Sequence, residues 1–389
     1  MKNSLAFVLN LLLCYVFSSM PIFCAEGIVP IIPIKSEKKI DNGRKQVVSA
    51  NFTKFLDPRH DPEIILSVPP PNPFVVSDEN ELTSVFFEFE QPEVRAVVAW
   101  NGQTDESGEE LLILAKEQRA IQGCGAVVGI MPLPGKPLSV KRITQDDSPE
   151  VSPNIFHTLK EMLISKWNAP IGSGPTFSPL RDLHNVYSVV VLKIDGLGTF
   201  EADFKDLIEV LYDGKATPLL PPEFFSVIKG YHDLGFRYFA FEISYVNQFF
   251  SQKEIIAYHF QSKSAYFPLV ISKIGGQGNT FVDLVVLTPD EITRSLFYDI
   301  GTKTNGFKDR NGNEAQVTLN GTGAVDLTKT ELNAVDKSLA DFFANNNLVK
   351  ARNFLISGEI NTFFFDFVVN NCIFYAEGQK GNSAEQEGY

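Results

Sequence analysis

The order of the hydrophobic patterns along the chain constrains its fold most. Four short β-branched or aromatic runs separated by turn residues come first, at 84–90, 94–100, 110–115 and 125–131. Helical periodicity then dominates, at 153–167, 202–212 and 222–233, with one strand pattern between at 187–194. Three more strand patterns follow, at 236–244, 254–261 and 281–288. Because strands and helices come in blocks, the sequence predicts an α+β fold, with a β-rich mixed-sheet body and about four helices, and not a doubly wound sheet.

The last hundred residues predict one more helix and two more strands. Thr328 followed by Glu331 three residues later fits a capping box, which predicts a helix from 328 to about 344. Strand patterns occur at 353–357 and 362–369. We therefore expect residues 291–376 to pack on a body formed by 81–290, and the polar tail at 377–389 to be disordered.

The N-terminus has the layout of a secretory signal peptide. Lys2 precedes an apolar run from Leu5 to Phe17 that is too short for a permanent membrane anchor. We expect a signal peptide at 1–25, cleaved after Cys24 or Ala25, and an extracytoplasmic protein, periplasmic or secreted, with no membrane span after cleavage. Lipid attachment at Cys24 is the alternative, although the bulky residue before it disfavours this.

A proline-rich segment follows the predicted signal peptide, at 26–80. Prolines at 69, 70, 71 and 73 fix φ and remove backbone donors, which favours polyproline II over helix or sheet. We interpret the segment as an extended arm that leads into the body.

Charge and cysteine content limit the partners and the covalent links. The net charge of −13 argues against a nucleic-acid partner, because phosphate binding needs a cationic surface. Of the four cysteines, only Cys124 and Cys372 lie clear of the signal region. In an oxidising compartment such a pair is predicted to form a disulfide. Two separately buried thiols, or a pairing with Cys24, are the alternatives.

The series of motifs resembles a known bacterial family. It includes AVVAWNG, EELLILA, AVVGIMPLPGKP, NIFHTLKEML, YSVVVLKID and YHFQSKSAYFPLVISKIG, in that order. Because of the order of these motifs, the chain resembles the exported proteins grouped as domain of unknown function 2330. The resemblance covers residues from about 94 to 287. The family has no established activity, so the resemblance implies kinship and leaves the function open.

Catalytic signatures are sparse in the sequence. It has no Gly-x-Ser-x-Gly elbow, no phosphate loop, no His-Glu-x-x-His and no paired-cysteine motif, so no metal or cofactor is indicated. Asp182 and His184 would project to the same side of an extended stretch, and His232 precedes Asp233 on a predicted helix. These four residues are the weak catalytic candidates, and a structural or surface role is favoured for each.

Two functions follow from these patterns. The first is a non-catalytic extracytoplasmic binding or assembly module with a protein or glycan partner. The alternative is a hydrolase whose acid and base residues are dispersed in the sequence, because a fold can bring distant residues together. A pocket in which several of the candidate side chains converge would favour the enzyme.

Overall fold

A computed structural model gives the fold of this protein. It describes residues 27–33, 64–67, 88–122, 125–143, 155–167, 185–211, 216–218, 220–246, 255–275, 279–292, 317–321, 323–359, 363, 366–370 and 373–375. The predicted signal peptide at 1–25 and the polar tail at 377–389 lie outside these ranges. Within them the chain forms two large sheets, one small sheet and five α-helices.

The first large sheet is six-stranded and antiparallel throughout. Its strands lie in the order β2-β7-β9-β5-β1-β8. Their bounds are Gly27–Pro33 for β1, Ile64–Ser67 for β2, Gly125–Leu133 for β5, Asn185–Lys193 for β7, Ala216–Pro218 for β8 and Tyr238–Val246 for β9.

The second large sheet is eight-stranded and mixed. Seven strands lie in the order β13-β15-β12-β3-β4-β10-β6, and β14 pairs with β15. The bounds are Glu88–Trp100 for β3, Glu109–Gln122 for β4, Pro137–Ile143 for β6, Ile255–Gln261 for β10, Asn279–Thr288 for β12, Val317–Gly321 for β13, Val325–Thr328 for β14 and Leu348–Glu359 for β15. The pair β3–β12 is parallel, and the other pairs are antiparallel.

A third sheet is small and connects the end of the chain to the body. Its strands are β11 (Ala265–Phe267), β16 (Phe367–Asn370) and β17 (Ile373–Tyr375), in the order β11-β16-β17. The 3-10 helix η4 (Val270–Lys273) follows β11 closely in the chain.

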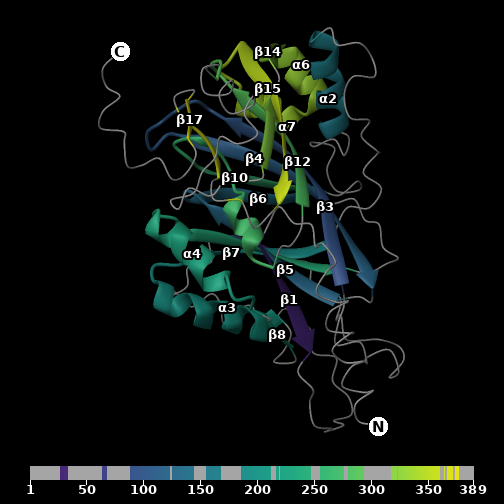
Figure 1. Ribbon diagram of the computed structural model, residues 1–389. Coiled ribbons are helices and arrows are strands. Elements are labelled where there is room, and N and C mark those ends of the chain that lie inside the picture. Colours follow the sequence, from purple (N-terminus) through teal and green to yellow (C-terminus); the bar gives the residue numbers. More distant parts are fainter. Residues whose placement is uncertain are drawn as a thin grey trace, which may run out of the picture.

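Helices cover the outer faces of both large sheets and produce four layers (Figure 1). Helices α3 (Leu197–Leu211) and α4 (Phe224–Asp233) share a buried apolar cluster with the six-stranded sheet. Helices α2 (Ile155–Lys166), α6 (Lys329–Val335) and α7 (Lys337–Phe342) share another with the eight-stranded sheet. The two sheets face each other across a third cluster, so the layers run helix, sheet, sheet, helix.

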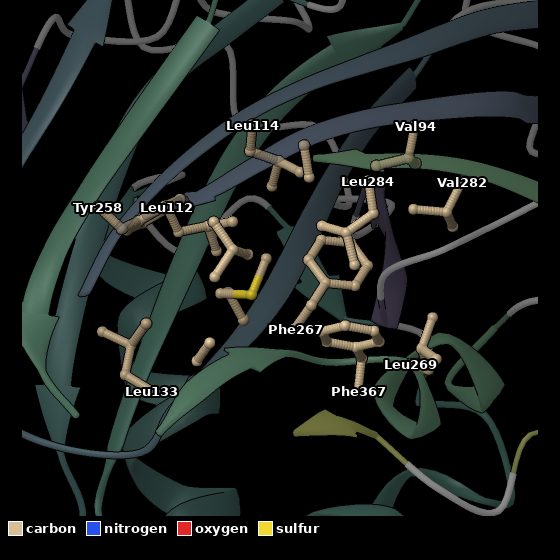
Figure 2. Close-up of a cluster of buried hydrophobic side chains, with 14 of the residues drawn as sticks. Val94, Leu112, Leu114, Leu133, Tyr258, Phe267, Leu269, Val282, Leu284 and Phe367 are labelled. Atoms are coloured by element: carbon tan, nitrogen blue, oxygen red, sulfur yellow. The ribbon is translucent and has the colours of Figure 1, made fainter. Parts of the chain in front are cut away.

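Strand alternation explains why each sheet is apolar on both faces. In β3, Val94, Ala96 and Val98 belong to the core between the sheets, whereas Val97 and Ala99 belong to the cluster under α2, α6 and α7. Figure 2 shows the core between the sheets, with aromatic rings from the small sheet packed beside aliphatic side chains of the eight-stranded sheet. A strand covered on both faces reads as a nearly continuous apolar run.

The structure confirms the predicted fold class and most of the predicted elements. It is α+β and β-rich, and the helices predicted near 153–167, 202–212 and 222–233 are α2, α3 and α4. The capping box is present, since Thr328 and Glu331 exchange hydrogen bonds at the start of α6. Hydrogen bonds from Lys166 and Thr328 lower the pKa of Glu331 to about 2.

Two differences from the predicted elements have local causes. The helix predicted from 328 to about 344 is divided at Asp336, which has extended backbone geometry and accepts a 2.8 Å hydrogen bond from the Ser338 amide to cap α7. In the segment predicted as an extended arm, β1 and β2 are extended as expected, but they pair within the six-stranded sheet. Polyproline II and strand are both extended, and the local sequence does not show whether an extended segment will find a pairing partner.

Candidate functional site

An open pocket lies between α4 and η4 and has a volume of about 510 Å³. Val227, Tyr231 and Leu234 line it from one face of the helix, because residues three and four apart share a face. Val270 and Lys273 line it from η4. We call it the α4–η4 pocket, and its volume falls in the range of ligand-binding sites.

A buried carboxyl group behind this pocket holds its two walls together. Asp366 Oδ1 accepts hydrogen bonds from the Tyr231 hydroxyl at 3.0 Å and from the Leu269 and Val270 amides at 2.7 and 2.8 Å. Its Oδ2 accepts one from the Tyr266 hydroxyl at 3.1 Å. Burial raises the pKa of Asp366, and the four donors oppose this rise. Asp366, which directly precedes β16, therefore links η4 to α4.

The polar side chains that line the pocket are engaged by the protein itself. Glu223 Oε1 accepts a hydrogen bond from the Gly275 amide at 3.2 Å, and the Ser226 hydroxyl donates to the Glu223 carbonyl at 2.8 Å. Asp233 forms an ion pair with Lys229, one helical turn before it. These contacts fix the shape of the pocket, and they offer no acid and base positioned together.

The structure does not bring the predicted catalytic residues together where it describes them. His232 Nε2 lies 3.3 Å from the Asp195 carbonyl oxygen, and Asp233 points to Lys229. Asp233 lines the α4–η4 pocket and His232 does not. Asp182, His184 and the predicted disulfide partners Cys124 and Cys372 lie outside the described residues.

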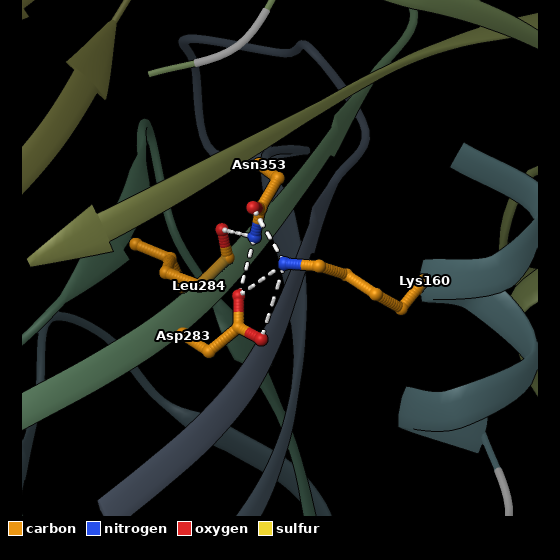
Figure 3. A network of polar contacts seen from close by, with 4 residues as sticks. All are labelled: Lys160, Asp283, Leu284 and Asn353. Atoms are coloured by element: carbon orange, nitrogen blue, oxygen red, sulfur yellow. Dashed lines mark hydrogen bonds and ion pairs between the residues drawn. The ribbon is translucent and has the colours of Figure 1, made fainter. Parts of the chain in front are cut away.

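A second polar cluster, under α2, was not predicted from the sequence (Figure 3). Lys160 Nζ lies 3.2 and 3.3 Å from the two carboxylate oxygens of Asp283 and donates to Asn353 Oδ1 at 2.8 Å. Asn353 Nδ2 donates to Asp283 Oδ1 at 2.5 Å and to the Leu284 carbonyl at 3.2 Å. The available signals were the single polar residue Asp283 in the apolar strand run FVDLVVL and the pair Arg352 and Asn353 at the start of the apolar run FLI.

The core between the sheets contains a buried acid. Glu110 of β4 is fully buried, and its Oε2 accepts a 2.7 Å hydrogen bond from the Tyr266 amide. Its Oε1 has no hydrogen-bond partner among the described residues. Burial raises the pKa of Glu110 well above its usual value. Burial among apolar side chains therefore favours the protonated form of this group.

The described ranges contain neither a metal-binding cluster nor a membrane-spanning helix. No three His, Cys, Asp or Glu side chains gather there closely enough to hold a metal ion. None of the described helices combines the length and apolar character that crossing a bilayer requires.

Comparison with known proteins gives only remote likenesses. No family model matches the chain, and no curated protein matches it. The resemblance to domain of unknown function 2330 therefore stays a prediction. Among solved structures, a crystal structure of baculovirus P35 is 9% identical, with a TM-score of 0.39, over 73% of this chain and 97% of that chain. A mutated baculovirus P35 after caspase cleavage is 8% identical, with a TM-score of 0.35, over 71% of this chain and 99% of that chain. Identities and TM-scores this low support no inference about this chain.

Proposed function

We propose that this protein is a non-catalytic extracytoplasmic binding or assembly module, and that the α4–η4 pocket is its binding surface. The observation that carries the proposal is that the polar side chains of the pocket have partners within the protein, whereas apolar side chains form much of its wall. Glu223 is hydrogen-bonded to the backbone and Asp233 is paired with Lys229 outside the pocket, while Val227, Leu234 and Val270 form the apolar part of the wall. Such a surface suits recognition by shape and apolar contact.

The exposure of Leu234 supports the same proposal. Leu234 lines the pocket and is 39% exposed at the end of α4, a helix that otherwise buries its apolar face. Phe225, 45% exposed, lies on the same helix outside the pocket. A large apolar side chain exposed within a pocket is typical of an interaction site. The partner in this proposal is an extracytoplasmic protein or glycan, consistent with the signal-peptide pattern and the acidic composition.

The two exposed residues provide a matched test. Leu234 lines the pocket and Phe225 does not, so Leu234→Lys and Phe225→Lys place the same charge on the same helix, inside and outside the proposed surface. The mature chain and both variants would be immobilised and incubated with the native envelope and medium fractions, and bound proteins and glycans quantified by mass spectrometry. We expect Leu234→Lys to lower recovery of the partner about tenfold, the loss typical of one good contact residue.

Phe225→Lys should recover the same partner at the wild-type level. Recovery that is equal for all three chains would remove the α4–η4 pocket from the proposal. Circular dichroism of both variants should match the wild type, because both side chains are exposed.

A further inference from the structure

We propose that the chain forms an internal covalent cross-link, an amide bond between the Lys160 side-chain nitrogen and the Asn353 side-chain carbon, with Asp283 as the proton carrier. This site is separate from the α4–η4 pocket and does not depend on the proposed function. It joins helix α2 to strand β15, 193 residues apart in the chain.

The orientation of the Asn353 amide favours attack by the lysine. Its Nδ2 donates to two acceptors, Asp283 Oδ1 at 2.5 Å and the Leu284 carbonyl at 3.2 Å, so Oδ1 faces the opposite way. Lys160 Nζ lies 2.8 Å from this Oδ1, and Cγ is the atom bonded to it. The amine therefore lies next to the carbonyl group it would attack, and the leaving nitrogen is already hydrogen-bonded to Asp283, the proposed proton carrier (Figure 3).

Burial makes the reaction possible at this site. Lys160 and Asp283 are each 7% exposed and Asn353 is 2% exposed, beneath the apolar side of α2. A charged pair in such surroundings is costly, and transfer of a proton from the ammonium to the carboxylate yields two neutral groups. The neutral amine is a nucleophile, whereas the ammonium is not. The low exposure of all three side chains limits the access of water, the competing nucleophile.

The steps balance without any co-reactant. Lys160 passes a proton to Asp283, and the neutral Nζ attacks Asn353 Cγ to form a tetrahedral intermediate. A second proton of Nζ moves through Asp283 to Nδ2, the Cγ–Nδ2 bond breaks, and ammonia leaves. Ammonia takes the first proton from Asp283 and departs as ammonium. One amide has been exchanged for another, nothing is oxidised or reduced, and Asp283 is again a carboxylate.

A neighbouring arginine would compensate the charge of Asp283 once the cross-link has formed. Arg95 of β3 is paired in register with Asp283 of β12 and is 6% exposed. Paired residues on adjacent strands point to the same face of the sheet. Once Lys160 has lost its charge in the amide bond, Arg95 supplies a positive charge beside the buried carboxylate.

Peptide mapping of the wild-type protein tests the proposal directly. The purified full chain would be reduced, denatured and digested, and the peptides sequenced by tandem mass spectrometry. We expect one branched species that contains both Lys160 and Asn353 and is lighter than the sum of its two peptides by one ammonia, about 17 Da. Recovery of the two peptides separately, unmodified and in full yield from natively folded protein, would overturn the proposal.

Two variants on α2 separate the cross-link from a simple ion pair. Lys160→Arg keeps the buried positive charge but removes the primary amine, so the branched species should be absent. Lys166→Arg is the matched control, because Lys166 is on the same helix and makes its ion pair to Glu331 at the surface; the branched species should persist. A branched species that survives Lys160→Arg would show that another lysine makes it and would also overturn the proposal.

Discussion

Replacing Glu110 by Gln should stabilise the protein increasingly as the pH rises. Glu110 is fully buried between the two large sheets, and burial raises its pKa well above the ordinary value of 4.5. The unfolded chain releases this proton near the ordinary pKa, while the folded chain retains it to higher pH. The wild type therefore has its full stability below the unfolded-state pKa and loses stability as the pH rises toward the folded-state pKa.

The slope of this loss follows from one proton. Between the two pKa values the folded chain holds one proton more than the unfolded chain, so the free energy of unfolding falls by about 1.4 kcal/mol per pH unit. Glutamine has the same shape and does not titrate. It can still accept the Tyr266 amide hydrogen bond, and it places a donor where the acid places its hydroxyl. At pH 4 the two proteins should therefore agree to within about 1 kcal/mol.

Urea unfolding at a series of pH values between 4 and about 8 measures this difference. Glu209→Gln is the control, because Glu209 is exposed on α3. We expect the stability difference between Glu110→Gln and the wild type to grow in favour of the variant with rising pH, and that for Glu209→Gln to stay nearly flat. A difference for Glu110→Gln that is also independent of pH would show that the Glu110 carboxyl is hydrated or paired, and would refute the reasoning.

Three further substitutions test the packing described above, each by urea unfolding. Asp366→Ala leaves four donors, three of them buried, without an acceptor and should cost about 3–5 kcal/mol, whereas Asp341→Ala at the surface should change stability by less than about 0.5 kcal/mol. Gly135→Ala would place its Cβ 2.2 Å from the Gln261 carbonyl oxygen and should cost about 1–3 kcal/mol. Gly230→Ala in α4 meets no atom within 4 Å and should stabilise by about 0.5–1 kcal/mol; a loss there would contradict the helix assignment.

The sequence predicted the helices and strands well where the apolar residues repeat regularly and the element does not depend on a distant pairing strand. Helix α4 was predictable because Phe224, Ile228 and Tyr231 repeat at helical spacing and all three are buried. Strand β6 was not, since it starts at Pro137 and its pairing with β10, more than a hundred residues later, gives no local signal. Pairing between distant strands is a property of the assembled sheet, and a short window of sequence does not contain it.

The candidate sites were harder to predict because they depend on distant residues. His232 and Asp233 stood out as neighbours, yet consecutive residues on a helix do not face each other. Lys160 follows the core residue Leu159, and its partner Asp283 is 123 residues away, so no local pattern marks the pair. Only the packing of α2 on the sheet shows that this lysine is buried.

Strand β15 is the last strand of the eight-stranded sheet to be synthesised, and it pairs with β12, β13 and β14. The parallel pair β3–β12 likewise joins segments that are almost 190 residues apart. Nearly the whole chain must therefore be synthesised before this sheet is complete. One edge of β3 stays unpaired until β12 has emerged, and one edge of β12 stays unpaired until β15 has emerged. Chains whose strands pair over such long sequence separations fold slowly, and their unpaired strand edges can aggregate with other chains. This protein should therefore depend on a chaperone that prevents aggregation until Leu348–Glu359 has emerged.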